Sequence, residues 1–132
     1  MNMIEIETKS KNEFIDITSL LKSEVALKNL NSAVLLVYIP HTTACVTINE
    51  SYDPDVAYDI LSSMQKLIPE NFHYKHREGN SPSHIKSGLF GNQLLIPVSD
   101  GQLMLGKWQG VFFCEYDGPR NRKIYTEFIK TV

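Results

Sequence analysis

The stretch AVLLVYI, residues 33–39, is apolar at almost every position and rich in Val, Leu and Ile. Such a composition is typical of a strand that is buried on both faces. The run stops at Pro40-His41, so the His41 side chain is expected to emerge where the strand ends. This stretch therefore predicts a β-sheet core with a titratable group at one end.

Further β-like segments lie on both sides of this central strand. They cover residues 4–7, 14–17, 45–49, 94–98, 103–105, 108–116 and 124–129. Ser99-Asp100-Gly101, between two of these segments, is a hairpin-turn signal. About seven strands are therefore expected, and neighbouring ones can pair in antiparallel fashion.

Helices are expected in three places. Thr18 can cap a helix that runs to about Leu30, and Asp53-Pro54 can begin a second, amphipathic helix that Pro69 ends. A third, short helix contains His84 and Lys86. The chain is thus predicted to be one α+β domain over residues 1–132, with mostly antiparallel sheets packed as two layers plus two or three helices.

Composition excludes several classes of protein. The chain has 132 residues, 42% of them hydrophobic, and a net charge of -2, so it lacks the basic excess that a nucleic-acid binder needs. It has neither a run of roughly 18 apolar residues for a membrane span nor a signal-like start. Cys45 and Cys114 sit in apolar sequence outside any CxxC spacing, which favours reduced core thiols in a cytoplasmic protein.

Histidines are the first candidate functional residues. His41 follows the central strand, His76 lies in the polar segment 70–91, and His84 lies in the short helix of that segment. The eight-residue spacing between His76 and His84 suits one metal ligand from a loop and one from the helix after it. Three converging imidazoles with an open fourth position would resemble a catalytic zinc site, although surface placement explains any single histidine equally well. His73 is assigned to that ordinary surface placement.

Carboxylates are the second set of candidates. Alternation along the strand 108–116 places Gln109, Val111, Phe113, Glu115 and Asp117 on one face and Phe112, Cys114 and Tyr116 on the other. Glu115 and Asp117 could act as base or ligand, or could simply pair with Arg120 after the Gly118-Pro119 turn. Glu50 is a further candidate, because capping explains Asp53 and Asp55 but not Glu50. Phe112 and Tyr116 could be covered by another subunit or by the chain's own core.

An anion could bind where the segment Gly79-Asn80-Ser81-Pro82-Ser83 enters the short helix. Free backbone N–H groups at a helix start attract negative charge, and Lys86 lies in the next turn. An ordinary capping role for Ser81 explains the segment equally well. The sequence contains no Walker A, Rossmann, GxSxG or HExxH motif.

Several blocks taken together resemble the YjbQ family. They are His41-Thr42-Thr43-Ala44 with Thr47-Ile48-Asn49-Glu50, Asp53-Pro54-Asp55-Val56, His76 with Glu78-Gly79-Asn80, His84-Ile85-Lys86, Pro97-Val98, Gly106 with Trp108-Gln109-Gly110, and Glu115 with Asp117-Gly118-Pro119-Arg120 and Arg122. These blocks run in order over nearly the whole chain, so the set is specific although no single block is.

The resemblance implies a homotrimer with a metal-associated pocket and a weak thiamine-phosphate synthase activity, which joins a pyrimidine diphosphate to a thiazole phosphate. It implies that His41, His76 and His84 are the metal ligands. Asn80, Lys86, Trp108, Gln109 and Arg120 are then the residues expected to contact the substrate.

The leading hypothesis is therefore a metal-dependent enzyme that acts on a phosphorylated small molecule. Three histidines favour zinc, and magnesium is the alternative with a diphosphate substrate. Glu50, Glu115 or Asp117 would supply a base or a further ligand. Two other hypotheses remain open: a metal-dependent hydrolase, and a non-enzymatic trimeric binding or structural protein whose metal stabilises the pocket.

Overall fold

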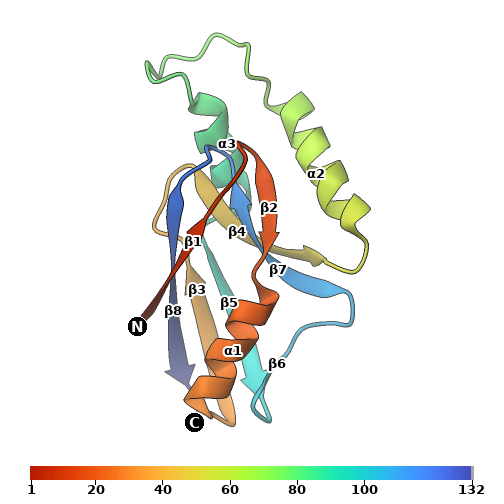
Figure 1. Cartoon of the computed structure of the whole chain (residues 1–132), viewed down its shortest axis with the longest axis vertical. Coiled ribbons are helices and arrows are strands. Elements are labelled where there is room, and N and C mark those ends of the chain that lie inside the picture. Colours follow the sequence, from red (N-terminus) through yellow and green to blue (C-terminus); the bar gives the residue numbers. More distant parts are fainter. Residues whose placement is uncertain (132) are drawn as a thin grey trace.

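The computed structural model describes residues 1–131, which form two antiparallel sheets and three helices (Figure 1). The strands are β1 (Asn2–Glu7), β2 (Glu13–Asp16), β3 (Ser32–Tyr38), β4 (Ala44–Glu50), β5 (Gln93–Ser99), β6 (Gln102–Leu103), β7 (Gln109–Glu115) and β8 (Asn121–Lys130). The helices are α1 (Thr18–Lys28), α2 (Pro54–Leu67) and α3 (Ser81–Phe90). One sheet has the strand order β1-β8-β3-β5-β6 and the other β2-β7-β4. The predicted two-layer α+β fold is confirmed.

The main core lies between the two sheets and under α1. Alternate residues of β3 and β7, such as Leu35, Val37 and Phe113, are fully buried there, and Leu21 of α1 closes the core at one end. The opposite face of the three-stranded sheet carries a second, smaller cluster of Cys45, Phe112, Cys114 and Tyr116. Leu61 of α2 and Phe90 of α3 pack on this cluster.

This second cluster shows whether another subunit or the chain's own core covers Phe112 and Tyr116. Phe112 and Tyr116 are covered by the chain's own helices, and the Phe90 and Tyr116 rings stack with centroids 6.4 Å apart. Cys45 and Cys114 are both buried free thiols, as expected. The alternation predicted for residues 109–117 is therefore confirmed, because each face of β7 has its own core.

The prediction for β3 was wrong in one respect. The strand buries Ala33, Leu35 and Val37, whereas Val34 and Leu36 are only partly buried and Tyr38 is exposed. No helix of the described residues covers this outer face. The outward-facing residues of this apolar run are therefore partly accessible to solvent in the single chain. The outer face also carries Leu95 of β5, directly opposite Leu36.

The turns and helix ends follow the local sequence closely. Asp100 and Gly101 both adopt positive φ between paired residues Ser99 and Gln102, which is the predicted two-residue hairpin. The Asp53 carboxylate accepts a hydrogen bond from the Asp55 N–H, as predicted for the cap of α2.

Two expected caps are not used. Thr18 lies inside α1 rather than before it, because its hydroxyl bonds the Asp16 carboxylate and accepts from the Val111 N–H. Ser81 does not cap α3, whose N-cap residue is Asn80. Among residues 1–131, no helix is both long and apolar enough to cross a membrane.

Candidate functional site

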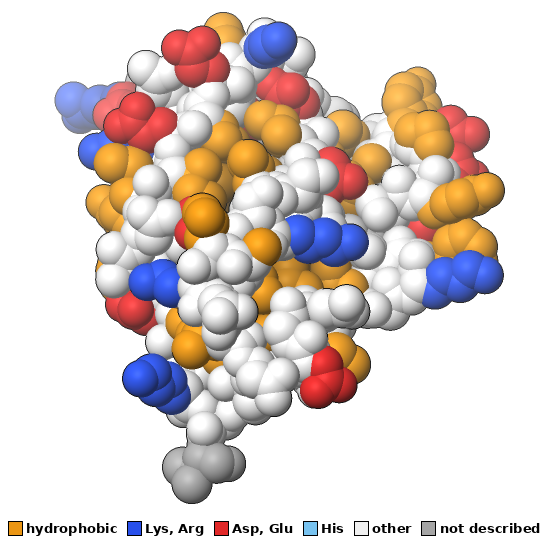
Figure 2. Space-filling model, turned by 60° about the horizontal axis from the view of Figure 1, so that its bottom comes forward, with side chains coloured by type: hydrophobic (Ala, Val, Ile, Leu, Met, Phe, Trp, Pro, Cys, Tyr) orange, Lys and Arg blue, Asp and Glu red, His pale blue; other side chains and the backbone are white. Residues whose placement is uncertain are grey.

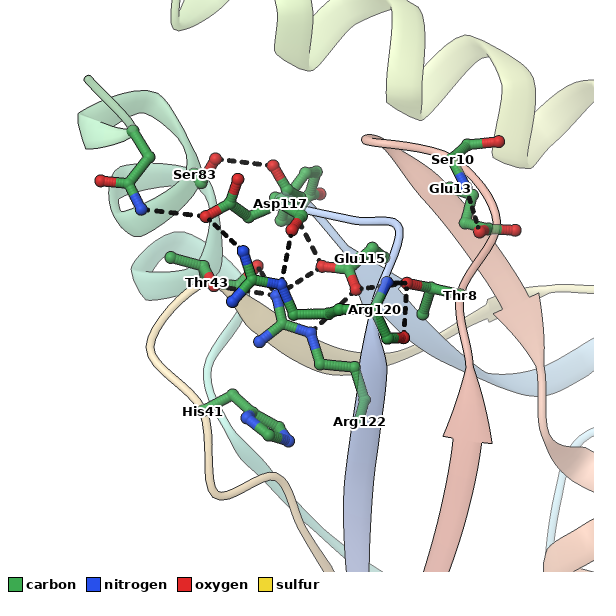
Figure 3. Close-up of polar contacts among 12 residues, drawn as sticks. Thr8, Ser10, Glu13, His41, Thr43, Ser83, Glu115, Asp117, Arg120 and Arg122 are labelled. Carbon is green, nitrogen blue, oxygen red and sulfur yellow. Dashed lines mark hydrogen bonds and ion pairs between the residues drawn. The ribbon is translucent and has the colours of Figure 1, made fainter. Parts of the chain in front are cut away.

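Glu115 and Arg122 form an ion pair buried between the two sheets (Figure 3). Glu115 ends β7 on its core face, and Arg122 points inward from β8, two residues before the buried Ile124. The guanidinium binds the carboxylate through two contacts, Nε to Oε2 at 2.8 Å and Nη2 to Oε1 at 2.6 Å. We call these two residues the inter-sheet ion pair.

Further hydrogen bonds surround the inter-sheet ion pair. The Thr8 hydroxyl and the Asp117 N–H donate to the Glu115 carboxylate at 2.8 and 2.9 Å, and Arg122 Nη2 also donates to the Thr43 hydroxyl at 2.8 Å. Burial alone would raise the Glu115 pKa, but hydrogen bonds from Arg122, Asp117 and Thr8 outweigh it and lower the pKa. Glu115 is thus a charged, fully bonded carboxylate, and its geometry suits positioning the strands rather than taking up a proton.

Asp117 and Arg120 lie just outside this pair, on either side of the cis Gly118-Pro119 peptide. Asp117 accepts from Asn80 Nδ2 at 2.9 Å and pairs with Arg120 Nη2 at 3.3 Å. Gly118 passes so close to the Ser10 carbonyl oxygen that a Cβ would overlap it. The turn therefore holds Asn80, at the start of α3, against the end of β7 and leaves half of Arg120 exposed.

His41 lies just beyond the end of β3, as predicted, and its ring accepts a backbone N–H of β8. Its Nε2 accepts the Lys123 N–H at 2.9 Å, on the part of β8 that β3 no longer pairs with. Burial and the positive charges of Arg122 and Arg120 lower the pKa of His41, while Glu115 partly opposes them. The neutral ring with its lone pair on Nε2 carries its proton on Nδ1, which makes Nδ1 a donor.

His41 and His84 line one pocket of about 430 Å³. The other lining residues are small or uncharged: Thr42, Ala44, Ser87, Gly88, Gly91 and Asn92. We call this set the histidine pocket. The volume lies within the roughly 300–1,000 Å³ range of small-molecule sites. Arg122 and Arg120 place positive charge near His41, and Glu115 offsets part of it; neither arginine is among the residues that line the pocket.

His76 adjoins this pocket through His84. The His76 and His84 rings meet edge to face with centroids 5.2 Å apart, and both line a second hollow with Tyr74, Ser81 and Ile85. The loop that carries His76 arches from the end of α2 over the start of α3 (Figure 1). The face shown in Figure 2 displays no histidine.

The three histidines do not meet as one metal centre in the single chain. The His76–His84 spacing suits two ligands, because two imidazoles on a tetrahedral zinc ion at about 2.0–2.1 Å have ring centres roughly 5 Å apart. His41 does not complete the set, since its Nε2 is bonded to the Lys123 N–H. No group of three His, Cys, Asp or Glu side chains within residues 1–131 could hold an ion, so the metal assignment stays a prediction.

Lys86 lies away from the histidine pocket, although it shares α3 with His84. It is fully buried, and its ammonium donates to Gln65 Oε1 at 2.7 Å and lies 5.5 Å above the Tyr116 ring. Burial lowers its pKa, and the Glu70 carboxylate partly opposes the effect. In this position Lys86 ties α3 to the end of α2 and has no exposed surface for a phosphate.

Glu50, Trp108 and Gln109 lie at the opposite end of β7 from Glu115. Glu50 pairs with Gln109 in the β4–β7 ladder, and the seven residues of β7 span about 20 Å. Trp108 is half exposed and packs edge to face on Tyr52, while the Gln109 side chain accepts the Gly106 N–H. Within one chain these three residues therefore do not reach the histidine pocket.

Sequence reasoning predicted no role for Arg122, Thr8 or Ser87, although Arg122 belongs to one of the blocks that resemble the family. Strand alternation could have identified Arg122, because it shares the inward face of β8 with Ile124, two residues further on. Thr8 approaches Glu115 from 107 residues away in the chain, and no local pattern indicates that contact.

These features define a class: a two-sheet α+β domain with a histidine-lined pocket between the β3–β4 turn and α3. The family described as "UPF0047 protein YjbQ-like" matches residues 2–131, and the chain belongs to this family.

Relatives and solved structures agree with the family match. The chain is 44% identical over 125 residues to UPF0047 protein MJ1081 of Methanocaldococcus jannaschii, covering 95% of this chain and 91% of that protein. It is 40% identical over 130 residues to UPF0047 protein YugU of Bacillus subtilis, covering 98% of both. The crystal structure of an uncharacterised YjbQ/UPF0047 protein from Clostridium acetobutylicum superposes with a TM-score of 0.95 at 44% identity, covering 98% of this chain and all of the other.

Proposed function

We propose that the protein is an enzyme that acts on a phosphorylated small molecule in the histidine pocket. One observation carries the proposal: His41 and His84 line the same pocket, within the field of Arg120 and Arg122. The arginine charges near His41 would attract a phosphate, and two imidazoles supply groups that can donate and accept protons near neutral pH.

The two histidines would have different tasks. His41 is fixed by the Lys123 N–H and presents its Nδ1 proton, so it would donate a hydrogen bond to a phosphate oxygen. His84 is the ring shared with the second hollow, and it would act as the general acid or base. Arg120, which is half exposed, would add a charge-assisted contact to the phosphate.

A divalent metal is a second part of this proposal, and it is tested separately. His76 and His84 would be its first two ligands, and His41 would have to exchange the Lys123 N–H for the metal to become the third. Zinc is favoured by imidazole ligands, and magnesium would come instead with a diphosphate substrate. Metal analysis of the purified protein beside His84→Ala tests this assignment, since unchanged metal content in the variant would contradict it.

The particular reaction is proposed from the family resemblance alone. A thiamine-phosphate synthase-like transfer would join a pyrimidine diphosphate to a thiazole phosphate and release pyrophosphate. Metal-assisted hydrolysis is the alternative reaction, and ligand binding without turnover is the non-enzymatic one. Incubation with both substrates, and then with each alone, separates the three by the product formed.

Assembly as a homotrimer is part of the proposal. The outer face of the five-stranded sheet carries partly exposed apolar side chains from four strands, namely Met3, Val34, Leu36, Tyr38, Leu95 and Ile129. Glu127, which lies opposite Leu36, interrupts this apolar surface. Exposed apolar side chains gathered on one face favour an interface. Light scattering should report three chains for the wild type and fewer for Leu95→Glu.

The test of the pocket itself follows the imidazole NMR signals during titration with inorganic pyrophosphate. We expect the His41 and His84 signals to shift, and the signal of His73 to stay, because His73 lies outside the pocket. His84→Gln should abolish turnover, whereas His73→Gln should leave it unchanged. Pyrophosphate binding that leaves both His41 and His84 unperturbed would contradict the proposed site.

A further inference from the structure

Ser87 of α3 carries a buried hydroxyl that has no hydrogen-bond partner. The residue is 6% exposed, it lines the histidine pocket, and its Oγ contacts no donor or acceptor in the described chain. Buried hydroxyls are ordinarily bonded, and a serine inside a helix usually bonds the carbonyl four residues earlier or faces solvent. Ser87 does neither, so its hydroxyl lies buried and unpartnered beside the pocket that the residue lines.

Ser83, one turn earlier on the same helix, shows the ordinary case. Its hydroxyl donates to the Tyr116 carbonyl oxygen at 2.6 Å, and the residue is 1% exposed. The two serines are similar in burial and differ in partner. The difference assigns Ser83 to the packing of α3 on β7 and leaves Ser87 for the pocket.

Gly88 next to Ser87 leaves open space in the pocket wall. A Cβ built at Gly88 would meet no atom within 4 Å, so packing against the rest of the chain does not require a glycine there. Glycine inside a helix is less stable than alanine. A molecule lying close to the α3 backbone would account for the missing side chain.

Charge is distributed unevenly along this pocket. Arg120 and Arg122 lie near His41, where Glu115 offsets part of their charge, whereas Gly88, Gly91 and Asn92 line the pocket without charge. His84 and Ser87 are three residues apart, which places them on the same face of α3. A phosphate would therefore lie among His41, His84 and Ser87, and an uncharged organic part would extend over Gly88.

We infer that Ser87 is a phosphate-binding residue and that Gly88 is a specificity-determining residue of the histidine pocket. This inference rests on the proposed function and refines it. The pocket takes a phosphate monoester whose organic part lies flat against α3, in the space that a side chain at position 88 would fill.

Two probes test the inference on the intact protein: inorganic phosphate, and phenyl phosphate, which adds a flat uncharged ring. We expect Ser87→Ala to weaken the binding of both by about five- to tenfold, the usual worth of one hydrogen bond. We expect Gly88→Leu to leave inorganic phosphate within about twofold and to weaken phenyl phosphate by about tenfold or more. Neither variant should lower the Tm, because Ser87 has no partner to lose and leucine is a better helix former than glycine.

Ser83→Ala is the matched control. It should lower the Tm, because it leaves the Tyr116 carbonyl without its donor, and it should bind both probes as the wild type does. If Ser87→Ala and Gly88→Leu both bind the probes as the wild type does while His84→Gln does not, the inference is overturned and the proposed function stands. If the wild type binds neither probe, the proposed function falls and the inference falls with it.

Discussion

The inter-sheet ion pair and the histidine pocket lie side by side, yet they satisfy their polar groups in opposite ways. Around Glu115, each carboxylate oxygen has two donors, and Arg122 of β8 binds both Glu115 of β7 and Thr43 of the β3–β4 connection. In the pocket, the Ser87 hydroxyl is unbonded and the Gly88 wall is open. A saturated set of contacts is what a structural element needs, and an unsaturated one is what a ligand needs. Changes in the first region should therefore cost stability, and changes in the second should cost binding.

The largest expected effect comes from breaking the ion pair. Arg122→Met removes the guanidinium and leaves the Glu115 carboxylate buried with only neutral donors. We expect the free energy of unfolding to fall by about 3–5 kcal/mol, the usual cost of stranding one partner of a buried pair. Urea denaturation measures it, and a loss below about 1 kcal/mol would contradict the structural role.

The double variant Glu115→Gln with Arg122→Met is the control for this prediction. Because no charge is then left buried, we expect it to recover part of the lost stability. Recovery would show that the stranded charge, rather than lost packing, causes the defect.

The next largest effect is expected from a comparison of two glycine-to-alanine substitutions, one at Gly118 beside the ion pair and one at Gly88 in the histidine pocket. Gly118→Ala places a Cβ against the Ser10 carbonyl and the Thr8 hydroxyl, which displaces the Thr8 donor from Glu115. Overpacking of this kind costs about 1–3 kcal/mol. Gly88→Ala meets no atom within 4 Å and should leave stability equal or higher. Equal Tm changes for the two variants would contradict the distinction between the regions.

Arg120→Gln should have a smaller effect on stability and a clear effect on binding. Arg120 pairs with Asp117 at 3.3 Å but is half exposed, and exposed pairs contribute below about 1 kcal/mol. Its charge acts on the histidine pocket, so we expect weaker binding of pyrophosphate. Lys11→Gln is the matched control, because Lys11 forms a similarly exposed pair with Glu70 at 3.4 Å and lines none of the described pockets. Calorimetry on both variants decides whether the loss is local to the pocket.

The sequence predicted the fold better than it predicted the site, and the reason is the range of the interactions. Strand alternation and cap residues are local, so the two faces of β7 and the Asp53 cap were predicted correctly. The roles of Glu115 and Lys86 depend on Arg122, Thr8 and Gln65, which come from distant elements. An isolated acid or lysine in a sequence cannot reveal that its charge is already paired.

The histidines illustrate the same limit. The end of β3 placed His41 correctly, because a strand followed by proline stops at a defined residue. Whether His41 meets His84 depends on the packing of α3 against β4, which no periodicity in the sequence indicates. Ser87 was missed because a serine inside a helix has no distinguishing pattern until its partner is found to be absent.

The smallest expected effect comes from the titration of His41. Its protonation should change stability and sulfate affinity in opposite directions. Because its pKa in the folded protein lies below 6.5, its contribution to stability is fully present above that pH and is lost as pH falls through the folded pKa. Protonation also adds a positive charge to the pocket, so the affinity for sulfate, whose charge stays constant over this range, should rise as stability falls. His41→Gln should remove the stability trend and weaken the sulfate trend, since an amide oxygen can still accept the Lys123 N–H but does not titrate, while His84 remains in the pocket. Thermal unfolding and sulfate binding measured between pH 7 and pH 5 (about two units around the histidine range) test this, and a sulfate affinity that falls together with stability would contradict the assignment of His41 to the ligand site.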